Sequence, residues 1–164
     1  FKDWLNANKD LSINNLLNLG FGGSTLVSCR TYFNRIVLPY NPDTIVFYAG
    51  DNDIGSGTSA DELLNEFLLF SSEVAEKIPH TRCFFISIKP SVFRSEYLDI
   101  ILDFNKKVKN SIDHLNQWKY IDLCSPMLET GYEKFYGEDP LHMNILGYSL
   151  LSKLIRDELD IFIN

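Results

Sequence analysis

The residues best suited to chemistry in this sequence are an aspartate and a histidine three positions apart, Asp139 and His142. This spacing can place both side chains on one face of a turn, so that the carboxylate accepts a hydrogen bond from one imidazole nitrogen. The other nitrogen then stays free to act as a base. On the simpler structural interpretation, Asp139 is a capping residue and His142 stands at a helix start, where both residue types are common.

A second polar cluster follows a short run of β-branched and aromatic residues at positions 44–49. The run predicts a strand buried on both faces, as in the middle of a parallel sheet. It ends in Gly50-Asp51-Asn52-Asp53, which predicts a tight polar turn. The side-chain amide of Asn52 can stabilise an oxygen anion that forms during acyl transfer. The alternative is a turn residue that tolerates left-handed backbone angles.

A glycine-rich loop at positions 20–25 forms the third polar cluster. Gly22 and Gly23 let the backbone approach a ligand closely and can present N–H groups to an anion, although a tight turn would use them equally well. The spacing is neither a Walker loop nor a dinucleotide-binding fingerprint, because no Gly-Lys-Ser/Thr and no GxGxxG pattern is present.

Other polar residues offer weaker alternatives. An oxygen-rich Mg²⁺ or Ca²⁺ site can be drawn from four carboxylates, Asp51, Asp53, Glu138 and Asp139, but no spacing demands one. The remaining histidines are expected on the surface. The three cysteines are widely spaced in apolar segments and fit buried thiols better than disulfides or a metal site.

The elements that must position these clusters alternate between strand and helix. Apolar runs predict strands at 13–19, 44–49, 82–88 and 120–123, and helical spacing predicts helices at 26–38, 59–78, 95–115 and 144–159. Ser24 or Thr25 is the expected N-cap of the first helix, and Ser59 with Glu62 forms a capping-box pattern at the second. Residues 127–138 are expected to be irregular.

This alternation predicts an α/β fold, a three-layer sandwich with helices on both faces of a parallel sheet. Residues 1–164 show no repeat or linker, so we expect a single domain. The carboxyl ends of parallel strands meet at one edge of the sheet, where ligands bind in such folds. The loops at 20–25 and 50–53 should therefore be neighbours, and a helix start beside them would bring His142 to the same place.

The overall composition excludes several functions. A net charge of −7 and a pI near 4.9 argue against nucleic-acid binding, which needs clustered Lys and Arg. No apolar run approaches the roughly 20 residues of a transmembrane helix. The 164 residues are enough to bury a sizeable core.

Taken together and in order, the three clusters resemble three of the four sequence blocks of SGNH hydrolases, the GDSL-type esterases. The matching segments are Asn18-Leu-Gly-Phe-Gly-Gly-Ser24, Gly50-Asp51-Asn52-Asp53 and Asp139-Pro-Leu-His142. The resemblance spans nearly the whole chain. It implies a flavodoxin-like α/β/α sandwich, an ester substrate that is a small molecule, a lipid or a carbohydrate, and no metal or organic cofactor.

The resemblance also implies roles for individual residues. His142 would be the general base and Asp139 its orienting partner. Asn52 would donate its side-chain amide to the oxyanion hole and Gly23 its backbone N–H, with Gly22 as the alternative donor. Pro140 stands where the family more usually has glycine, and this changes the expected loop geometry rather than the roles.

The block that carries the family's nucleophilic serine is not matched. Trp4 resembles the tryptophan that often follows this serine, so we expect the serine and its strand just upstream of Phe1. Within the chain, Ser12 precedes its expected strand and Ser24 lacks the Gly-x-Ser-x-Gly elbow, so neither is a good substitute.

These features predict a serine ester hydrolase that acts through an acyl-enzyme. One alternative is a catalytically inactive SGNH-like domain that binds acyl or anionic groups, and another is a flavodoxin-like module that binds flavin or phosphate. The substrate's acyl chain and alcohol depend on loop shape, so the catalytic residues do not define them. Residues 89–94 and 132–137 are expected to shape the pocket.

Overall fold

The computed structural model describes residues 3–160, and its centre is a sheet of three parallel strands. The strands are β1 (Thr44–Phe47), β2 (Arg82–Ile86) and β3 (Trp118–Ile121), in the order β1-β2-β3. Val46 is in register with Phe84, and Phe84 with Lys119. The parallel direction places all three strand ends, and the loops that follow them, at one edge.

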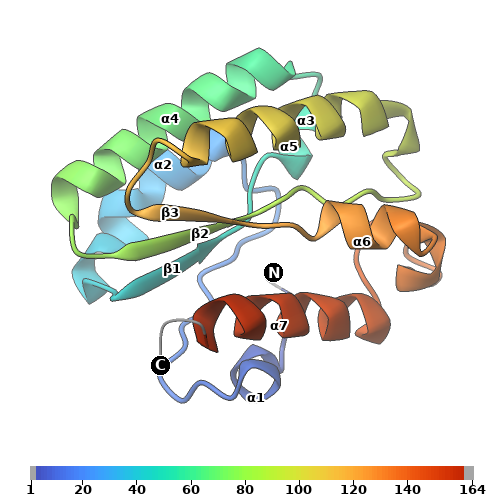
Figure 1. Cartoon of the computed structure of the whole chain (residues 1–164), viewed down its shortest axis with the longest axis horizontal. Coiled ribbons are helices and arrows are strands. Elements are labelled where there is room, and N and C mark those ends of the chain that lie inside the picture. The colour runs from blue at the N-terminus through green and yellow to red at the C-terminus, as the bar shows by residue number, and fades with distance from the viewer. Residues whose placement is uncertain (1–2, 161–164) are drawn as a thin grey trace.

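Helices cover both faces of this sheet (Figure 1). One layer holds α2 (Leu26–Ile36), α4 (Ala60–Lys77) and α5 (Leu98–Ile112), and the other holds α1 (Ala7–Leu11) and α7 (Ile145–Asp160). The predicted α/β class and three-layer arrangement are confirmed.

Two apolar cores separate the layers. The core under α4 and α5 is largely aromatic, with Phe47 stacked on Phe70 at 4.6 Å between ring centroids and Phe67 edge-on to Trp118 at 5.0 Å. The second core joins the opposite face of the sheet to α1 and α7 and includes Trp4. Burying many large side chains on both faces is the main stabilisation available to such a fold.

Capping residues set the starts of two helices as predicted. At α2 the N-cap is Thr25, whose hydroxyl accepts from the backbone N–H of Ser28. Ser59 and Glu62 form the capping box of α4. Each cap satisfies backbone N–H groups that have no partner inside the helix.

The predicted strand at 13–19 is wrong, because these residues form turns and irregular backbone. A strand is defined by backbone pairing, and within residues 3–160 none pairs with the outer edge of β1. As a result β1 is half-buried over Thr44–Val46 rather than buried on both faces, and a largely apolar hollow of about 940 Å³ lies beside it. Trp4, Leu16 and Ile155 contribute to its walls.

Several short helical segments were not predicted. The region expected to be irregular, residues 127–138, includes the end of α6 (Cys124–Glu129) and the whole of the 3₁₀ turn η3 (Tyr132–Phe135). Short 3₁₀ turns η1 (Leu38–Tyr40) and η2 (Ser95–Tyr97) follow α2 and precede α5. The polar turn after β1 is itself a helical turn, α3 (Asp51–Gly55).

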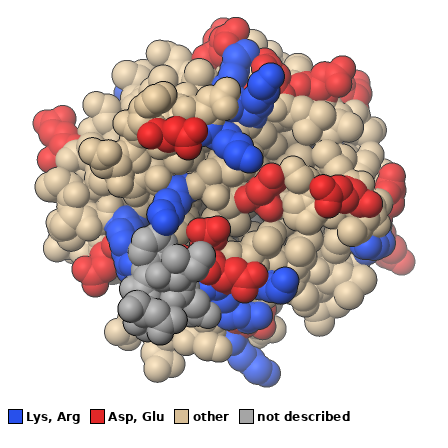
Figure 2. Space-filling view, viewed as in Figure 1, with Lys and Arg blue, Asp and Glu red and all other residues tan. Residues whose placement is uncertain are grey.

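The surface carries charged side chains of both signs. On the face seen in Figure 2, basic side chains are interspersed with acidic ones. Among the described residues, none of the helices combines the length and apolar character needed to cross a membrane.

Candidate active site

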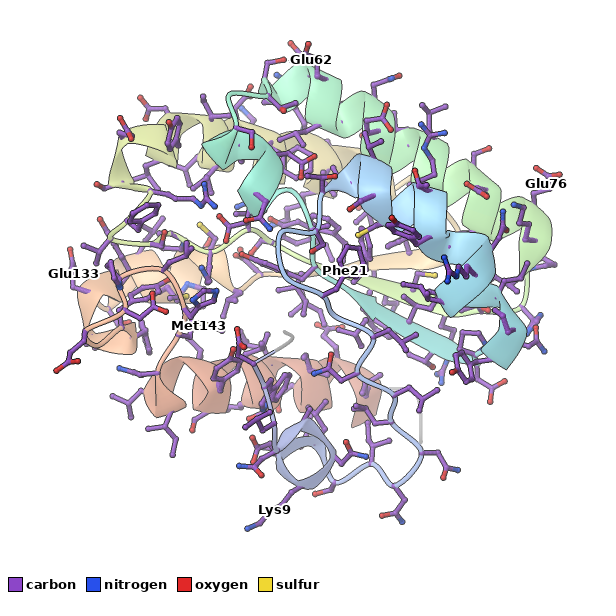
Figure 3. The ribbon with its side chains drawn as sticks, turned by 180° about the vertical axis from the view of Figure 1, so that it is seen from behind. Lys9, Phe21, Glu62, Glu76, Glu133 and Met143 are labelled. Atoms are coloured by element: carbon purple, nitrogen blue, oxygen red, sulfur yellow. The ribbon has the colours of Figure 1, made fainter. Side chains whose placement is uncertain are left out.

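Residues from all three polar clusters line one pocket of about 140 Å³ at the carboxyl edge of the sheet. The glycine-rich loop contributes Gly20–Ser24, the end of β1 contributes Asn52, and the segment before α7 contributes His142. Phe21 and Met143, both labelled in Figure 3, belong to this lining and come from segments far apart in the sequence. The predicted convergence of the three loops is therefore present.

Asp139 and His142 are directly hydrogen-bonded, with 2.6 Å between Asp139 Oδ2 and His142 Nδ1. The other carboxylate oxygen, Oδ1, accepts from the backbone N–H groups of Leu141 and His142 at 2.8 and 3.1 Å. These contacts, led by the N–H of Leu141, lower the pKa of Asp139 to about 2. Asp139 therefore caps the turn and orients the imidazole at the same time.

The helix-start interpretation of His142 is wrong. Helix α7 begins at Ile145, and the side chain of Asn144 accepts from the backbone N–H groups of Leu146 and Gly147. Asn144 performs the capping function, so His142 lies in the preceding loop. Its second ring nitrogen, Nε2, is 3.8 Å from Asp3 Oδ2, a neighbour that the sequence did not reveal.

Asn52 is held in the first turn of α3 with both ends of its carboxamide engaged. Its Nδ2 donates to the carbonyl oxygen of Ser24 at 2.9 Å, and its Oδ1 accepts from Arg94 Nη2 at 3.1 Å. One of the two amide hydrogens is thus used within the protein and the other remains available.

The backbone at Gly50 brings Asn52 to this position. Gly50 has a φ of +112°, and a Cβ built there would lie 2.8 Å from Ile88 Cδ1. Only glycine fits this combination of backbone angle and close packing.

Gly22 and Gly23 are exposed to the pocket, and Gly23 has a φ of +70°. Among the described residues, neither glycine N–H has a hydrogen-bond acceptor. Both are available as donors to an oxygen in the pocket, so the choice between them stays open.

A buried ion cluster formed by Asp51, Lys89 and Arg94 lies against the pocket and was not predicted. Lys89 Nζ is 3.4 Å and Arg94 Nε 2.7 Å from the Asp51 carboxylate, which also accepts from Tyr48 at 3.1 Å. Burial lowers the pKa of Lys89, and the Asp51 carboxylate opposes this shift. Because Lys89 and Arg94 are only 7 and 8% exposed, the cluster is shielded from solvent.

The metal alternative finds no support in this arrangement. Asp51 is paired with cations, and Asp53 accepts from the backbone N–H of Leu26, while burial raises the pKa of Asp53. Across residues 3–160, no three His, Cys, Asp or Glu side chains gather in a way that could hold a metal ion. The cysteines Cys29, Cys83 and Cys124 are free thiols.

The pocket walls differ from the predicted ones. Of segments 89–94 and 132–137, only Lys89 lines the pocket. Tyr136 lies outside the pocket lining, and its hydroxyl donates a hydrogen bond to the carbonyl oxygen of Pro90, the residue after Lys89. The apolar walls are formed by Phe21, Leu123, Met143, Tyr148 and Leu151. Tyr148 and Leu151 lie on α7. The spacing of apolar residues along this helix predicts which positions are buried, but it does not distinguish those that face the core from those that face the pocket.

The model of the GDSL-like lipase/acylhydrolase family matches residues 1–150. The chain belongs to this family. Membership explains why the three polar clusters occur in this order, and it makes the protein a hydrolase of the esterase and acylhydrolase kind. No curated protein sequence matches the chain.

Solved structures of GDSL-type hydrolases share the fold. A provisionally assigned acylhydrolase from Bacteroides fragilis has a TM-score of 0.83 at 19% identity, over 99% of this chain and 83% of its own. A lipase/acylhydrolase from Enterococcus faecalis has a TM-score of 0.78 at 23% identity, over 93 and 82%. An acetylxylan esterase from Geobacillus stearothermophilus has a TM-score of 0.73 at 16% identity, over 87 and 71%.

Proposed function

We propose that this protein is a serine ester hydrolase that cleaves carboxylic esters through an acyl-enzyme. The observation that carries the proposal is the 2.6 Å contact between Asp139 and His142 beside a pocket lined by His142, Asn52 and the glycine-rich loop. A base with a fixed tautomer and donors for an oxyanion are the two devices that acyl transfer requires.

In the proposed mechanism, Asp139 accepts the Nδ1–H of His142, which leaves Nε2 as the proton acceptor. His142 removes the proton of the nucleophilic serine as its oxygen attacks the ester carbonyl, and it then protonates the leaving alcohol. Water repeats the sequence on the acyl-enzyme and releases the acid. The nucleophile in this mechanism is a serine, and among residues 3–160 no serine is hydrogen-bonded to His142.

The negative charge that develops on the carbonyl oxygen would be stabilised by the second amide hydrogen of Asn52 and by the backbone N–H of Gly23. Removing one such donor typically costs about 10²- to 10³-fold in kcat. Gly22 is the alternative backbone donor.

We further propose that the acyl group is short. The pocket of about 140 Å³ is smaller than the roughly 300–1,000 Å³ of sites for drug-sized ligands. The acetylxylan esterase among the structural neighbours acts on an acetyl ester, which agrees with a small acyl site. A series of p-nitrophenyl esters from acetate to octanoate should therefore show falling kcat/KM with chain length.

The decisive experiment measures hydrolysis of p-nitrophenyl acetate by protein produced from the full coding sequence. His142→Ala should lower kcat by about 10²- to 10⁴-fold, the usual contribution of a general base. The matched control is His114→Ala, because His114 is exposed after α5 and outside the pocket. Equal rates for His142→Ala and the unchanged enzyme would exclude His142 as the base.

A fluorophosphonate probe distinguishes an enzyme with a narrow substrate range from an inactive domain. Labelling that disappears in His142→Ala would show an activated serine even if simple esters are not cleaved. The absence of both hydrolysis and labelling would favour a ligand-binding domain and contradict the proposal.

A further inference from the structure

Arg94 is buried next to the oxyanion donor Asn52, and its role is not explained by charge pairing alone. Its Nε is 2.7 Å from Asp51 Oδ1, but the N–H does not point along this line, so the contact is an ion pair rather than a well-formed hydrogen bond. Its Nη2, by contrast, donates a hydrogen bond to Asn52 Oδ1. Burying a guanidinium costs free energy of desolvation. The hydrogen bond that Arg94 Nη2 donates goes to the neutral side chain of Asn52 and not to a carboxylate, so charge pairing does not account for it.

The partners of Asn52 determine which way its carboxamide points. A guanidinium can only donate and a backbone carbonyl can only accept. Arg94 therefore requires the amide oxygen on its side, and the carbonyl of Ser24 requires the amide nitrogen on the other. A flipped amide would set donor against donor and acceptor against acceptor. The second N–H is consequently left in one defined orientation.

The chain is shaped to admit the Arg94 guanidinium at this position. A Cβ built on Gly55 in α3 would lie 1.2 Å from Arg94 Nη1, so the guanidinium occupies the space that a larger residue would fill. The backbone of Arg94 is also anchored, because its N–H donates to Ser91 Oγ at 3.3 Å and Ser91 is buried.

We propose that Arg94 is a positioning residue that fixes and polarises the carboxamide of Asn52, so that its second N–H is preorganised for the oxyanion. A cation that binds the amide oxygen draws electron density from the nitrogen and strengthens the N–H as a donor. Donors that are already oriented need no rearrangement as charge develops. The kinetic consequence rests on the proposed function, whereas the orientation of Asn52 does not.

Two variants separate this role from simple support of the fold. Arg94→Lys keeps a cation for Asp51 but lacks the fork that reaches Asn52 as well. Gly55→Ala keeps Arg94 and displaces the end of its flexible side chain. Both should lower kcat on p-nitrophenyl acetate by about 10- to 100-fold, since one oriented donor is worth about 10²- to 10³-fold, and KM should change little. Lys107→Met, which removes a surface lysine bound to Asp61 and Asp103, is the control.

A double-mutant cycle then tests the route of the effect. If Arg94 acts through Asn52, adding Arg94→Lys or Gly55→Ala to Asn52→Ala should change kcat by less than about twofold, which is the margin within which the effects of independent mutations usually add. Losses that multiply in the double variants would show that Arg94 acts by another route and would overturn the proposal.

A measurement that needs no activity completes the test. The side-chain amide protons of Asn52 are assigned in a ¹H–¹⁵N spectrum as the pair missing from Asn52→Ala. In Arg94→Lys and Gly55→Ala these resonances should shift and exchange faster with solvent, while Lys107→Met leaves them in place. Unchanged Asn52 resonances would overturn the proposal. If the wild-type protein showed no His142-dependent hydrolysis, the proposed function would be contradicted. The NMR measurement would still decide whether Arg94 orients the side chain of Asn52.

Discussion

Lys89 Nζ donates a hydrogen bond of 2.9 Å to the carbonyl oxygen of Leu141, the residue that immediately precedes His142. The same ammonium group lies 3.4 Å from Asp51, next to Asn52. A single buried side chain thus connects the segment that carries His142 with the segment that carries Asn52. The loop after β2, which carries Lys89, therefore bridges the segment after β1 and the loop before α7.

We expect Lys89→Met to lower kcat/KM by about tenfold, because a loosely held base is poorly aligned for proton transfer. The free energy of unfolding should fall by about 1–3 kcal/mol, since the carbonyl of Leu141 loses a buried partner while Asp51 keeps Arg94. Ester hydrolysis and urea unfolding measure the two effects. Lys77→Met, which removes a lysine bound to Glu73 at the end of α4, serves as the control. Unchanged kcat/KM in Lys89→Met would show that the bridge has no catalytic effect.

Local patterns in the sequence were sufficient to predict much of the fold and the meeting of three loops at one pocket. The three strands, four long helices and the caps at Thr25 and Ser59 follow from periodicity and capping chemistry, which act over a few residues. The 2.6 Å contact between Asp139 and His142 is likewise local, because the two residues are three positions apart on one turn.

The features that the sequence did not reveal depend on residues far apart in the chain. Asp51 meets Lys89 and Arg94 only after β1 and β2 pair, and no local pattern marks a lysine or arginine that will be buried. The strand expected at 13–19 failed for a related reason, because strand formation depends on a pairing partner as well as on residue type.

The acid sensitivity of the loop before α7 should depend on Asp139. Its pKa is lowered from 3.8 to about 2, so its carboxylate binds protons less readily in the folded state than in the unfolded one. The stabilisation is therefore complete above about pH 4 and is lost as the pH falls through about 2. The melting temperature of Asp139→Asn should lie below that of the unchanged protein at pH 6, and the gap should narrow below pH 4.

Thermal unfolding followed by circular dichroism between pH 2 and 7 measures this gap. Asp113→Asn, which changes an exposed aspartate at the end of α5, is the matched control. A gap that stayed constant down to pH 2 would mean that the charge on Asp139 does not stabilise the fold.

The three thiols should be almost unreactive in the native protein. Burial raises the pKa of Cys29 and Cys124 from 9.0 to about 11 and that of Cys83 to about 12. A rise from 9.0 to about 11 lowers the reactive thiolate fraction at pH 8 by roughly a hundredfold. An Ellman titration at pH 8 should proceed slowly in buffer and reach three thiols promptly in 6 M guanidinium chloride. Rapid reaction of one native thiol would show that its segment opens more readily than the packing indicates.

Gly50 should be among the least replaceable residues, because it fixes the exit from β1 toward Asn52. An alanine there combines an unfavourable φ of +112° with a Cβ 2.8 Å from Ile88 Cδ1 and 3.2 Å from Phe104 Cε1. Backbone strain and overpacking together predict a loss of about 3 kcal/mol in the free energy of unfolding. Gly137→Ala is the matched control, since a Cβ at Gly137 meets nothing within 4 Å. Urea unfolding compares the two variants. A similar, small loss in both would mean that α3 and the side chain of Ile88 move apart at little cost, and Asn52 would then be held by its hydrogen bonds to Ser24 and Arg94 alone.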